Sequence, residues 1–545
     1  MRHKVFVLGL AVLLLAGISS SAIATELVIL HTNDTHSNLF PFGPHDQYGG
    51  IGRMSTLIKK LRSENENVLA LHAGDAFVGT FAFNKYLGYP ELKIMEGLYD
   101  AMALGNHEFD LGPVVLGYVL AGFNPITGQP FGDPVALPIL AANVDFSSVP
   151  LLKAFVQPWT IKEIGGMKVG LLGVVTSERV YYSPDFVEIF GDPYAAAGKA
   201  VDEMRKEVGC CEVVIALSHL GLPFDLMGLS MVPGIDVIVS SHSHDEFFDA
   251  NVNGKIIAQA GAFGKNLGEL RIEVDDTAGA VTVKSHVLHP VTSAIHEDPK
   301  LLRYLNTLRT GIYRDPRYGP VYSQHVAKAL WDLEEMWVED DPHRQRSHRD
   351  TPLGNLVADA IRDGVTKAGY PVDVALEANG YIGHKIYEGK VVGNDVMLAV
   401  PYGYDPVSGL GFKLKNVSLY GAELVAGLEY TVSMVEYTED FSLQVSGLTF
   451  AYDSTRRAYN RVDLASVKIN GQPLNPYGLY RIALNEKLLE VLAGLLAANG
   501  IEVTERVVDP SPDLLEFNVV KEYMNGLNHL KYTSQGRIID TAAVP

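Results

Sequence analysis

The sequence predicts an α/β protein of two domains, with the functional residues at the ends of strands in a layered sheet. The chain has 545 residues, which is long for one hydrophobic core. Short apolar runs alternate with helical patterns through the first half, as they do in layered α/β sheets. A stretch rich in proline, arginine and acidic residues at 313–350 then precedes a second set of strands and helices.

Composition and charge narrow the classes of partner. Hydrophobic residues make up 47% and charged residues 20% of the chain, as in ordinary globular proteins. The formal net charge of −20 disfavours binding to nucleic acid or to an anionic membrane surface. We therefore expect a small-molecule partner, and an anionic one would need local cations, such as bound metal ions, to offset this charge.

The N-terminus has the pattern of a secretory signal peptide. A basic segment at 2–4 precedes the apolar stretch 5–16, and Ala22-Ile23-Ala24 fits the cleavage rule. We expect residues 1–24 to be removed, which leaves a periplasmic or extracellular protein without a membrane span. The alternative is an uncleaved anchor, but the apolar stretch is short for a span.

Cys210 and Cys211 are the only cysteines of the chain. Adjacent cysteines form only a strained and rare bridge, so we expect free thiols without a role. With no other cysteine, the sequence predicts a fold that no disulfide holds and excludes a zinc–thiolate site.

The elements of the first half follow one another in a regular order. Helical spacing with a polar outer face predicts helices at 51–62 and 195–207. Short alternating runs within 255–288 predict the edge of a sheet. Apolar runs bounded by polar residues predict buried strands at 26–34, 67–75, 99–106, 138–144, 167–176, 212–221 and 234–245.

The second half begins after an amphipathic helix at 298–313 and the connector. Its helices are predicted at 353–363, 422–433 and 484–499, and its strands at 372–377, 412–419 and 444–452. Gly500 suits the position just after the end of the last helix.

Polar side chains of one kind stand where the strands of the first half end. Ligands bind beyond the carboxyl ends of strands in open α/β sheets, so we expect these side chains to converge on one crevice. On an extended backbone, the spacing of Asp34 from His36 and of His242 from His244 puts each pair on one face. The full set is Asp34, His36, Asp75, Asn106, His107, His219, His242 and His244.

This set has too many ligand-type residues for one tetrahedral ion. Imidazole and carboxylate ligands without thiolate suit two ions that share a carboxylate, with Zn, Mn, Fe or Co favoured over Ca or Mg. Each residue taken alone is as well explained by a helix cap or a structural histidine, but their joint placement favours the metal site. Such a site suits metal-assisted hydrolysis of a phosphate ester, with His107 as a donor oriented by Asp110.

The motifs TNDTH, GD, GNHEFD, SHLG and HSH resemble those of the calcineurin-like metallophosphoesterases. The longer pattern around them is similar to the secreted 5′-nucleotidase and UDP-sugar hydrolase family. The resemblance implies a four-layer α/β/β/α sandwich at 25–297, a linker helix and connector at 298–350, and an α/β substrate-binding domain at 351–545. It also implies one metal on Asp34, His36, Asp75 and His244, a second on Asp75, Asn106, His219 and His242, and a catalytic dyad of His107 and Asp110.

The second half resembles the family's C-terminal domain more weakly. In ANGYIGHKI, Gly383 stands where the family has an arginine. The family's GGDGF segment, which supplies one of two rings that stack the base, is replaced by an apolar helix. Phe441 lies one position from the other ring. The candidate substrate contacts are Asn379, Tyr381, His384, Lys385, Tyr402 and Phe441.

Together, these expectations predict one function and leave several alternative functions open. We expect a secreted phosphoesterase with two divalent ions, Zn or Mn ahead of Fe or Co. It would hydrolyse nucleotides or related phosphate esters by attack of metal-bound hydroxide on phosphorus. Rivals are a 2′,3′-cyclic-nucleotide phosphodiesterase, a UDP-sugar hydrolase, a nonspecific phosphomonoesterase, or a secreted binding protein without turnover. The missing arginine and ring predict that activity depends on the phosphate ester more than on the base.

Overall fold

The computed structural model describes residues 24–177, 189–207, 210–275, 280–335, 348–438, 440–510 and 514–542. All of the predicted signal peptide except Ala24 lies outside these residues. Within the described part of the chain, no helix has the length and apolar character needed to cross a bilayer.

Two sheets form the centre of the N-terminal lobe. The seven-stranded sheet has the order β13-β12-β1-β2-β3-β4-β5 and the six-stranded sheet β10-β11-β9-β8-β7-β6. The strands of the first are β1 (Ala24–Thr32), β2 (Val68–His72), β3 (Ala101–Ala103), β4 (Ile139–Leu140), β5 (Val156–Gln157), β12 (Asn266–Asp275) and β13 (Val281–Pro290). Those of the second are β6 (Trp159–Ile164), β7 (Met167–Val175), β8 (Val213–His219), β9 (Val237–Val239), β10 (Glu246–Val252) and β11 (Lys255–Ala260).

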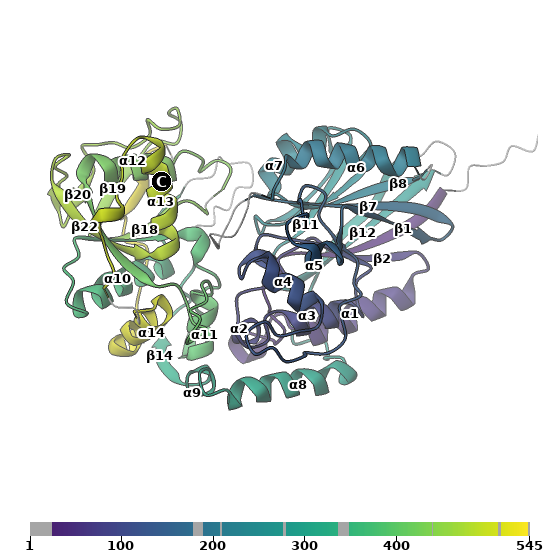
Figure 1. Cartoon of the computed structure of the whole chain (residues 1–545), viewed down its shortest axis with the longest axis horizontal. Coiled ribbons are helices and arrows are strands. Elements are labelled where there is room, and N and C mark those ends of the chain that lie inside the picture. Colours follow the sequence, from purple (N-terminus) through teal and green to yellow (C-terminus); the bar gives the residue numbers. More distant parts are fainter. Residues whose placement is uncertain are drawn as a thin grey trace, which may run out of the picture.

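Side-chain alternation along the strands explains the layers. Leu27 and Ile29 of β1 pack between the two sheets, whereas Val28 and Leu30 pack with the helix α1 (Ile51–Glu64). On the other sheet, β7 and β8 present alternate residues to α6 (Pro193–Glu207). Figure 1 shows α6 on one side of the sheets and α1 on the other. The predicted four-layer sandwich is confirmed.

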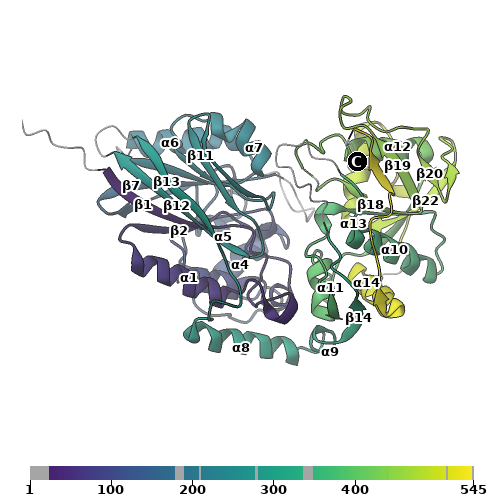
Figure 2. The ribbon, with the colours of Figure 1, turned by 180° about the vertical axis from the view of Figure 1, so that it is seen from behind.

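Short helices complete this lobe and lead to the next. They are α2 (Phe81–Tyr86), α3 (Tyr89–Met95), η2 (His107–Phe109), α4 (Pro113–Leu120), α5 (Pro150–Lys153) and α7 (Leu222–Met227). Then α8 (Pro299–Arg314) begins at Asp298, whose side chain caps it by accepting from the Lys300 N–H. Figure 2 shows α8 running beneath the first lobe toward α9 (Gly319–Tyr322) and the second lobe.

The C-terminal lobe is built on a sheet of order β18-β15-β22-β17-β23. Along β15, Val374 and Leu376 pack against leucines of α12 and α13, and Ala375 packs with α10. These elements are β15 (Val374–Ala378), β17 (Leu414–Tyr420), β18 (Leu443–Ser446), β22 (Leu479–Asn485), β23 (Val507–Val508), α10 (Pro352–Lys367), α12 (Gly421–Thr431), α13 (Glu486–Ala498) and α14 (Glu516–Leu527).

Two small sheets surround this core, with the orders β16-β14-β24 and β21-β20-β19-β25. The strand β14 (His325–Ala329) lies in the stretch predicted as a connector, yet it pairs with β16 and β24. The predicted strand 444–452 is two strands, β18 and β19, because Gly447 interrupts it with φ 74°. The remaining elements are β16 (Gly389–Val392), α11 (Gly393–Ala399), β19 (Leu448–Tyr452), β20 (Lys468–Ile469), β21 (Gln472–Pro473), β24 (His529–Leu530) and β25 (Ile538–Asp540).

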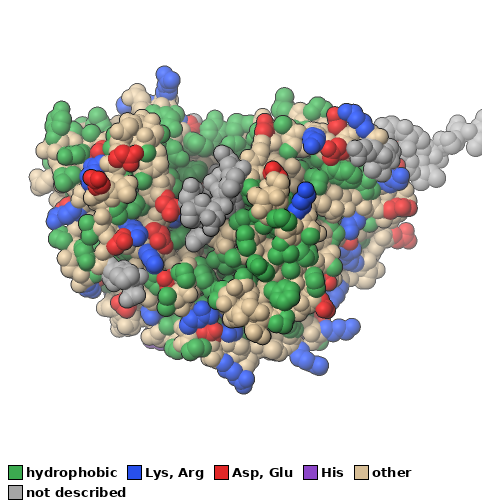
Figure 3. All heavy atoms as spheres, in the orientation of Figure 1, with side chains coloured by type: hydrophobic (Ala, Val, Ile, Leu, Met, Phe, Trp, Pro, Cys, Tyr) green, Lys and Arg blue, Asp and Glu red, His purple; other side chains and the backbone are tan. Residues whose placement is uncertain are grey.

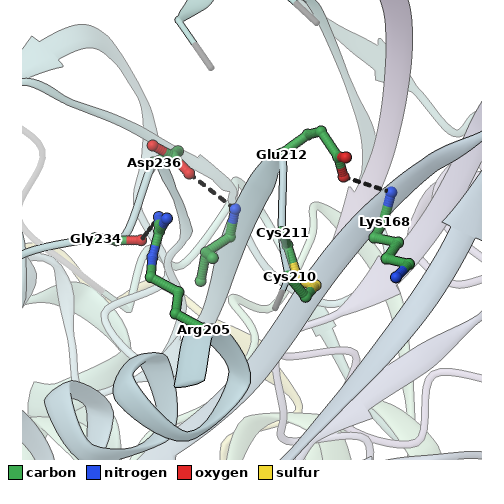
Figure 4. Close-up of a disulfide and its surroundings, with 8 residues drawn as sticks. Lys168, Arg205, Cys210, Cys211, Glu212, Gly234 and Asp236 are labelled. Atoms are coloured by element: carbon green, nitrogen blue, oxygen red, sulfur yellow. Dashed lines mark hydrogen bonds between the residues drawn. A yellow bond between two sulfur atoms is a disulfide. The ribbon is translucent and has the colours of Figure 1, made fainter. Parts of the chain in front are cut away.

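The expectation of free thiols is wrong. Cys210 and Cys211 are joined by a disulfide just before β8, as Figure 4 shows. The sequence argument rejected this bridge because adjacent cysteines are rarely joined, and such a general preference does not decide a particular pair.

Aromatic and polar contacts join the two lobes. Phe81 of α2 packs on Tyr318, with ring centroids 5.5 Å apart, and on Phe517 of α14 at 5.9 Å. The Asn84 amide donates to the Gly409 carbonyl at 2.6 Å.

On the outer surface, hydrophobic side chains gather over α4 and α5 of the N-terminal lobe (Figure 3). The exposed hydrophobic residues of α4 include Val114 and Tyr118, with 56% and 44% of their surface exposed.

Candidate metal centre

The ligand-type residues predicted at strand ends lie together in the structure. Asp34 and His36 follow β1, Asp75 follows β2, and Asn106 and His107 follow β3. His219 is the last residue of β8, and His242 and His244 follow β9. Their oxygen and nitrogen atoms form three groups, each within 4.8 Å, that could hold a metal ion: Asp34, His36 and His244; His36, Asp75 and His107; and Asp75, His219 and His242.

The backbone reaches this arrangement differently from the sequence argument. Asp34 and His36 have φ of 47° and 45°, and His242 and His244 have φ of 75° and 58°. Asp75 is also left-handed, with φ 56°. Both pairs therefore stand in tight turns after their strands, and the reason given for their convergence, an extended backbone, is wrong. Left-handed non-glycine residues cost free energy and gather where surrounding structure holds them for function.

The first group brings two imidazoles together edge-on, with their planes 71° apart. Nε2 of His36 lies 3.1 Å from Nε2 of His244, which is 3.7 Å from Oδ1 of Asp34. Burial, with the nearby His244, lowers the pKa of His36 well below its ordinary value. The His36 ring is therefore neutral at physiological pH and offers a lone pair, which is the form that binds a metal ion.

The third group, Asp75, His219 and His242, is arranged around His219. Its Nε2 lies 3.0 Å from Oδ2 of Asp75 and 3.1 Å from Oδ1 of Asn106. Its other nitrogen, Nδ1, lies 2.9 Å from the Ala73 carbonyl, which fixes the ring and turns Nε2 toward the carboxylate. Although burial opposes ionisation, His219 and His107 hold the pKa of Asp75 well below its usual range.

Asp75 belongs to two of the three groups, one with His36 and one with His219 and His242. This is the position that a carboxylate shared by two ions requires. The donor set of imidazoles, carboxylates and one amide therefore fits divalent transition-metal ions, in the chemistry that the sequence predicted.

His107 is held differently on its two sides. Nδ1 lies 3.0 Å from Oδ2 of Asp110, and Nε2 lies 3.9 Å from Oδ2 of Asp75. Although burial disfavours the charged ring, these two carboxylates raise the pKa of His107 to about 9. Without a metal ion, the ring is therefore protonated at neutral pH and Nε2–H can donate. The distances also admit His107 as a ligand, together with His36 and Asp75.

Sequence reasoning missed the residue that holds two ligand turns together. The Glu108 carboxylate accepts backbone N–H groups from Asp75 at 3.0 Å, Ala76 at 2.8 Å, Phe77 at 3.1 Å and Gly105 at 2.6 Å. It thus joins the turn after β2 to the turn after β3. A side chain on Gly105 would run into Oδ1 of Asp75, so only glycine fits at this position.

Residues of the C-terminal lobe complete the site. A cavity of about 280 Å³ is lined by Asp75, Asn106, His107, His242 and His244 on one side and by residues of the second lobe on the other. The Tyr402 ring stacks on His107, with centroids 4.9 Å apart and planes 18° apart. The cavity is therefore shared between the lobes.

The candidate substrate residues fall into two places. Tyr381 and Phe441 line the cavity. Asn379 is buried, and its side-chain Oδ1 accepts from Nε2 of Gln444 at 3.3 Å. His384 and Lys385 line a separate cavity.

His384 packs on Phe263 with ring centroids 3.8 Å apart, and Lys385 pairs with Asp332 at 3.0 Å and Glu334 at 2.9 Å. At Gly383, a Cβ atom would lie 2.5 Å from the Leu398 carbonyl oxygen, so this backbone has no room for the family's arginine.

Comparisons with known proteins agree with this geometry. Residues 27–246 match the calcineurin-like phosphoesterase family, and residues 333–493 match the 5′-nucleotidase C-terminal domain. The chain is 29% identical to a trifunctional nucleotide phosphoesterase of Bacillus subtilis, over 84% of this chain but 31% of that protein. It is 27% identical to rat 5′-nucleotidase, over 95% of this chain and 91% of that one.

A solved structure shares the whole architecture. The 5′-nucleotidase precursor from Thermus thermophilus superposes with a TM-score of 0.78 at 29% identity. The match covers 95% of this chain and all of the other (100%).

Proposed function

Because the chain belongs to the family in which a calcineurin-like phosphoesterase domain precedes a 5′-nucleotidase C-terminal domain, we propose that it hydrolyses nucleotides or related phosphate esters with two bound divalent ions. Zn and Mn are the ions we expect first, followed by Fe and Co, because the site mixes nitrogen and oxygen ligands. The observation that carries the proposal is the gathering of seven ligand-type residues in three groups, of which Asp75, His107, His242 and His244 line a cavity shared by both lobes.

The proposed ligands divide as the resemblance implies. One ion would be held by Asp34, His36, Asp75 and His244. The other would be held by Asp75, Asn106, His219 and His242. Two ions bound there would lower the pKa of water and offset the charge of the phosphoryl group.

In this proposal, the chain's own residues orient the ester and handle a proton. Asp110 accepts from Nδ1 of His107, which leaves Nε2–H directed into the cavity. From there Nε2–H can donate to a phosphoryl or leaving-group oxygen. Tyr402 stacks on the same ring and limits its rotation. The Glu108 carboxylate keeps the turns of Asp75 and Asn106 in register.

The nucleotide part of the proposal is supported by the names of the relatives. The longer Bacillus relative is a trifunctional nucleotide phosphoesterase, and the rat and Thermus proteins are 5′-nucleotidases. The N-terminal pattern at 2–24 supports export to the periplasm or the outside of the cell. We also keep the division of the mature chain at 25–297, 298–350 and 351–545 as part of the proposal.

Metal content tests the shared carboxylate. The purified protein should carry about two transition-metal ions per chain and hydrolyse phosphate esters. Asp75→Asn should lower the content of both ions and abolish hydrolysis, because one carboxylate serves both sites. Asp110→Asn is the matched control, an identical change in the same site, and should keep both ions. One ion per chain that survives Asp75→Asn would contradict the model of two ions sharing this carboxylate.

A further inference from the structure

The cavity at the metal centre extends into an aliphatic chamber in the C-terminal lobe. The N-terminal lobe supplies ligand-type residues to its lining, including Asp75 and His242. In the C-terminal lobe, β15, α12 and α13 supply hydrocarbon side chains to the same cavity. These are Leu376, Leu424, Leu428, Leu488, Leu492 and Leu495.

The helix spacing explains why these side chains face one way. On α12, Leu424 and Leu428 are four residues apart, and on α13, Leu488, Leu492 and Leu495 follow the same helical period. They therefore form one stripe on each helix, and both stripes border the cavity.

The chamber offers few partners to a polar ring. Among the described lining residues there is no lysine or arginine. The Thr431 hydroxyl donates to the Leu428 carbonyl at 2.9 Å, and the Asp440 carboxylate accepts from Thr438 at 2.7 Å. The Asp440 charge also opposes a second phosphate group. Most of the lining is hydrocarbon, so the polar edges of a base would lose water here for few hydrogen-bond partners, which disfavours a buried base.

The aromatic rings of the cavity are packed against one another. Phe441 meets Tyr430 edge-on, with planes 69° apart, and Tyr381 meets Tyr402 at 64°. Tyr402 and His107 are parallel, but their centroids are only 4.9 Å apart, which leaves no room for a base between them. None of these three ring pairs leaves room for a planar group between its members.

From these observations we infer that the preferred substrates are phosphate monoesters of uncharged, hydrocarbon alcohols, whose leaving group fills this chamber. The inference rests on the proposed phosphoesterase function and specifies its substrate class. One water adds across the ester bond: its oxygen joins phosphorus, the bond from phosphorus to the alcohol oxygen breaks, and a proton ends on the alcohol. A cavity of about 150 Å³ holds a benzene ring, so about 280 Å³ accommodates a longer chain.

A series of n-alkyl phosphates from ethyl to decyl tests this inference on the metal-loaded protein. Each added methylene that enters the chamber should raise kcat/KM about threefold to fourfold, until the chamber is full. The kcat/KM for octyl phosphate should exceed that for ethyl phosphate by about a hundredfold or more. It should also exceed the kcat/KM for AMP. Equal rates for ethyl and octyl phosphate, with AMP at least about tenfold better, would overturn the inference and leave the phosphoesterase proposal standing.

Two variants of α13 connect the series to the chamber. Leu492 and Leu489 are both 8% exposed, but only Leu492 lines the cavity. Leu492→Phe should shift the optimum to shorter chains, whereas Leu489→Phe should keep the wild-type profile. Taking the ratio of kcat/KM for octyl phosphate to kcat/KM for ethyl phosphate within each variant cancels differences in the fraction of active protein. An unchanged profile in Leu492→Phe, with a normal thermal transition, contradicts the assignment of the chamber. If that variant does not fold, the wild-type series still decides.

A binding measurement separates this inference from the proposed function. Calorimetry with non-hydrolysable n-alkyl phosphonates measures how binding affinity depends on chain length, without any turnover. If no ester is hydrolysed but affinity still rises with chain length, the chamber stands as assigned and the hydrolase proposal fails. If affinity is independent of chain length, the inference fails whatever the rates are.

Discussion

At the scale of single residues, His107 has two ring nitrogens in different surroundings. Nδ1 faces the Asp110 carboxylate at 3.0 Å, while Nε2 is directed toward the cluster of Asp75. Asp110 thus fixes both the tautomer and the plane of the ring, which is what a proton donor to a substrate oxygen requires. The role of the dyad stays a proposal until it is tested by mutation.

His107→Ala should lower kcat by about 10²–10⁴-fold while metal content is unchanged, because the variant loses a donor and no ligand. Asp110→Asn should lower kcat by a smaller factor, since the His107 ring remains and only its orientation is relaxed. Steady-state kinetics and elemental analysis of both variants are the measurements. Loss of a metal ion in His107→Ala would assign the residue as a ligand, as its distances to His36 and Asp75 also permit.

At the scale of elements, the first turn of α13 depends on a buried pair of acids. Asn485 caps the helix by accepting from the Leu488 N–H at 2.8 Å, and its amide donates to both carboxylate oxygens of Glu377 at 2.9 and 3.0 Å. Burial, and then the neighbouring Glu377, raise the pKa of Glu516 well above its ordinary value, and burial also raises the pKa of Glu377. The pair therefore keeps a proton in the folded protein.

This pair predicts that the protein loses stability as the pH rises. Unfolded glutamates ionise near pH 4.5, whereas the folded pair ionises at a higher pH. The contribution of the pair to the free energy of unfolding is complete below about pH 4.5 and is lost as the pH rises through the folded pKa values. Glu516→Gln should flatten the fall of Tm between about pH 4.5 and 8.

The control for this prediction is Glu522→Gln, an exposed change on the same helix α14. It should keep the wild-type dependence of Tm on pH. A Glu516→Gln curve that runs parallel to the wild-type curve would show that the pair does not share a proton.

At the scale of the whole molecule, the site exists only where the lobes meet. Tyr402 of the C-terminal lobe stacks on His107 of the N-terminal lobe, and the chamber lies behind it. A second stack, between Tyr48 and Tyr387, joins the lobes away from His107, with ring centroids 5.7 Å apart. Substrate is therefore expected to contact both lobes at once.

Tyr402→Ala should lower kcat/KM by up to about tenfold, since a ring contact contributes about 0.5–1.5 kcal/mol beyond its buried area. Tyr402→Phe should restore it to within about twofold, because the ring supplies the contact. Tyr387→Ala removes a stack between the lobes without touching His107 and should leave kcat/KM near the wild-type value. Equal losses in Tyr402→Ala and Tyr387→Ala would mean that the stack only holds the lobes together.

Much of this molecule follows from local patterns in the chain. The alternation of apolar runs with helical patterns predicted a layered α/β sheet, because both patterns depend on neighbours in sequence, and the family resemblance implied the four layers. The polar residues after β1, β2 and β3 of one sheet and after β8 and β9 of the other predicted one crevice, since parallel strands within each sheet end at a common edge.

Tertiary structure alone decided the rest. The left-handed turns at Asp34 and Asp75, and the Glu108 carboxylate that joins two of the ligand turns, depend on backbone geometry that no spacing rule encodes. The sequence also named His384 and Lys385 as substrate contacts, which stays a prediction; packing against Phe263 and pairing with Glu334 accompany their place in a separate cavity. Which side of α13 faces the metal centre is fixed by the packing of one lobe on the other. Segments far apart in the chain are in contact there, and local patterns in the sequence do not specify such contacts.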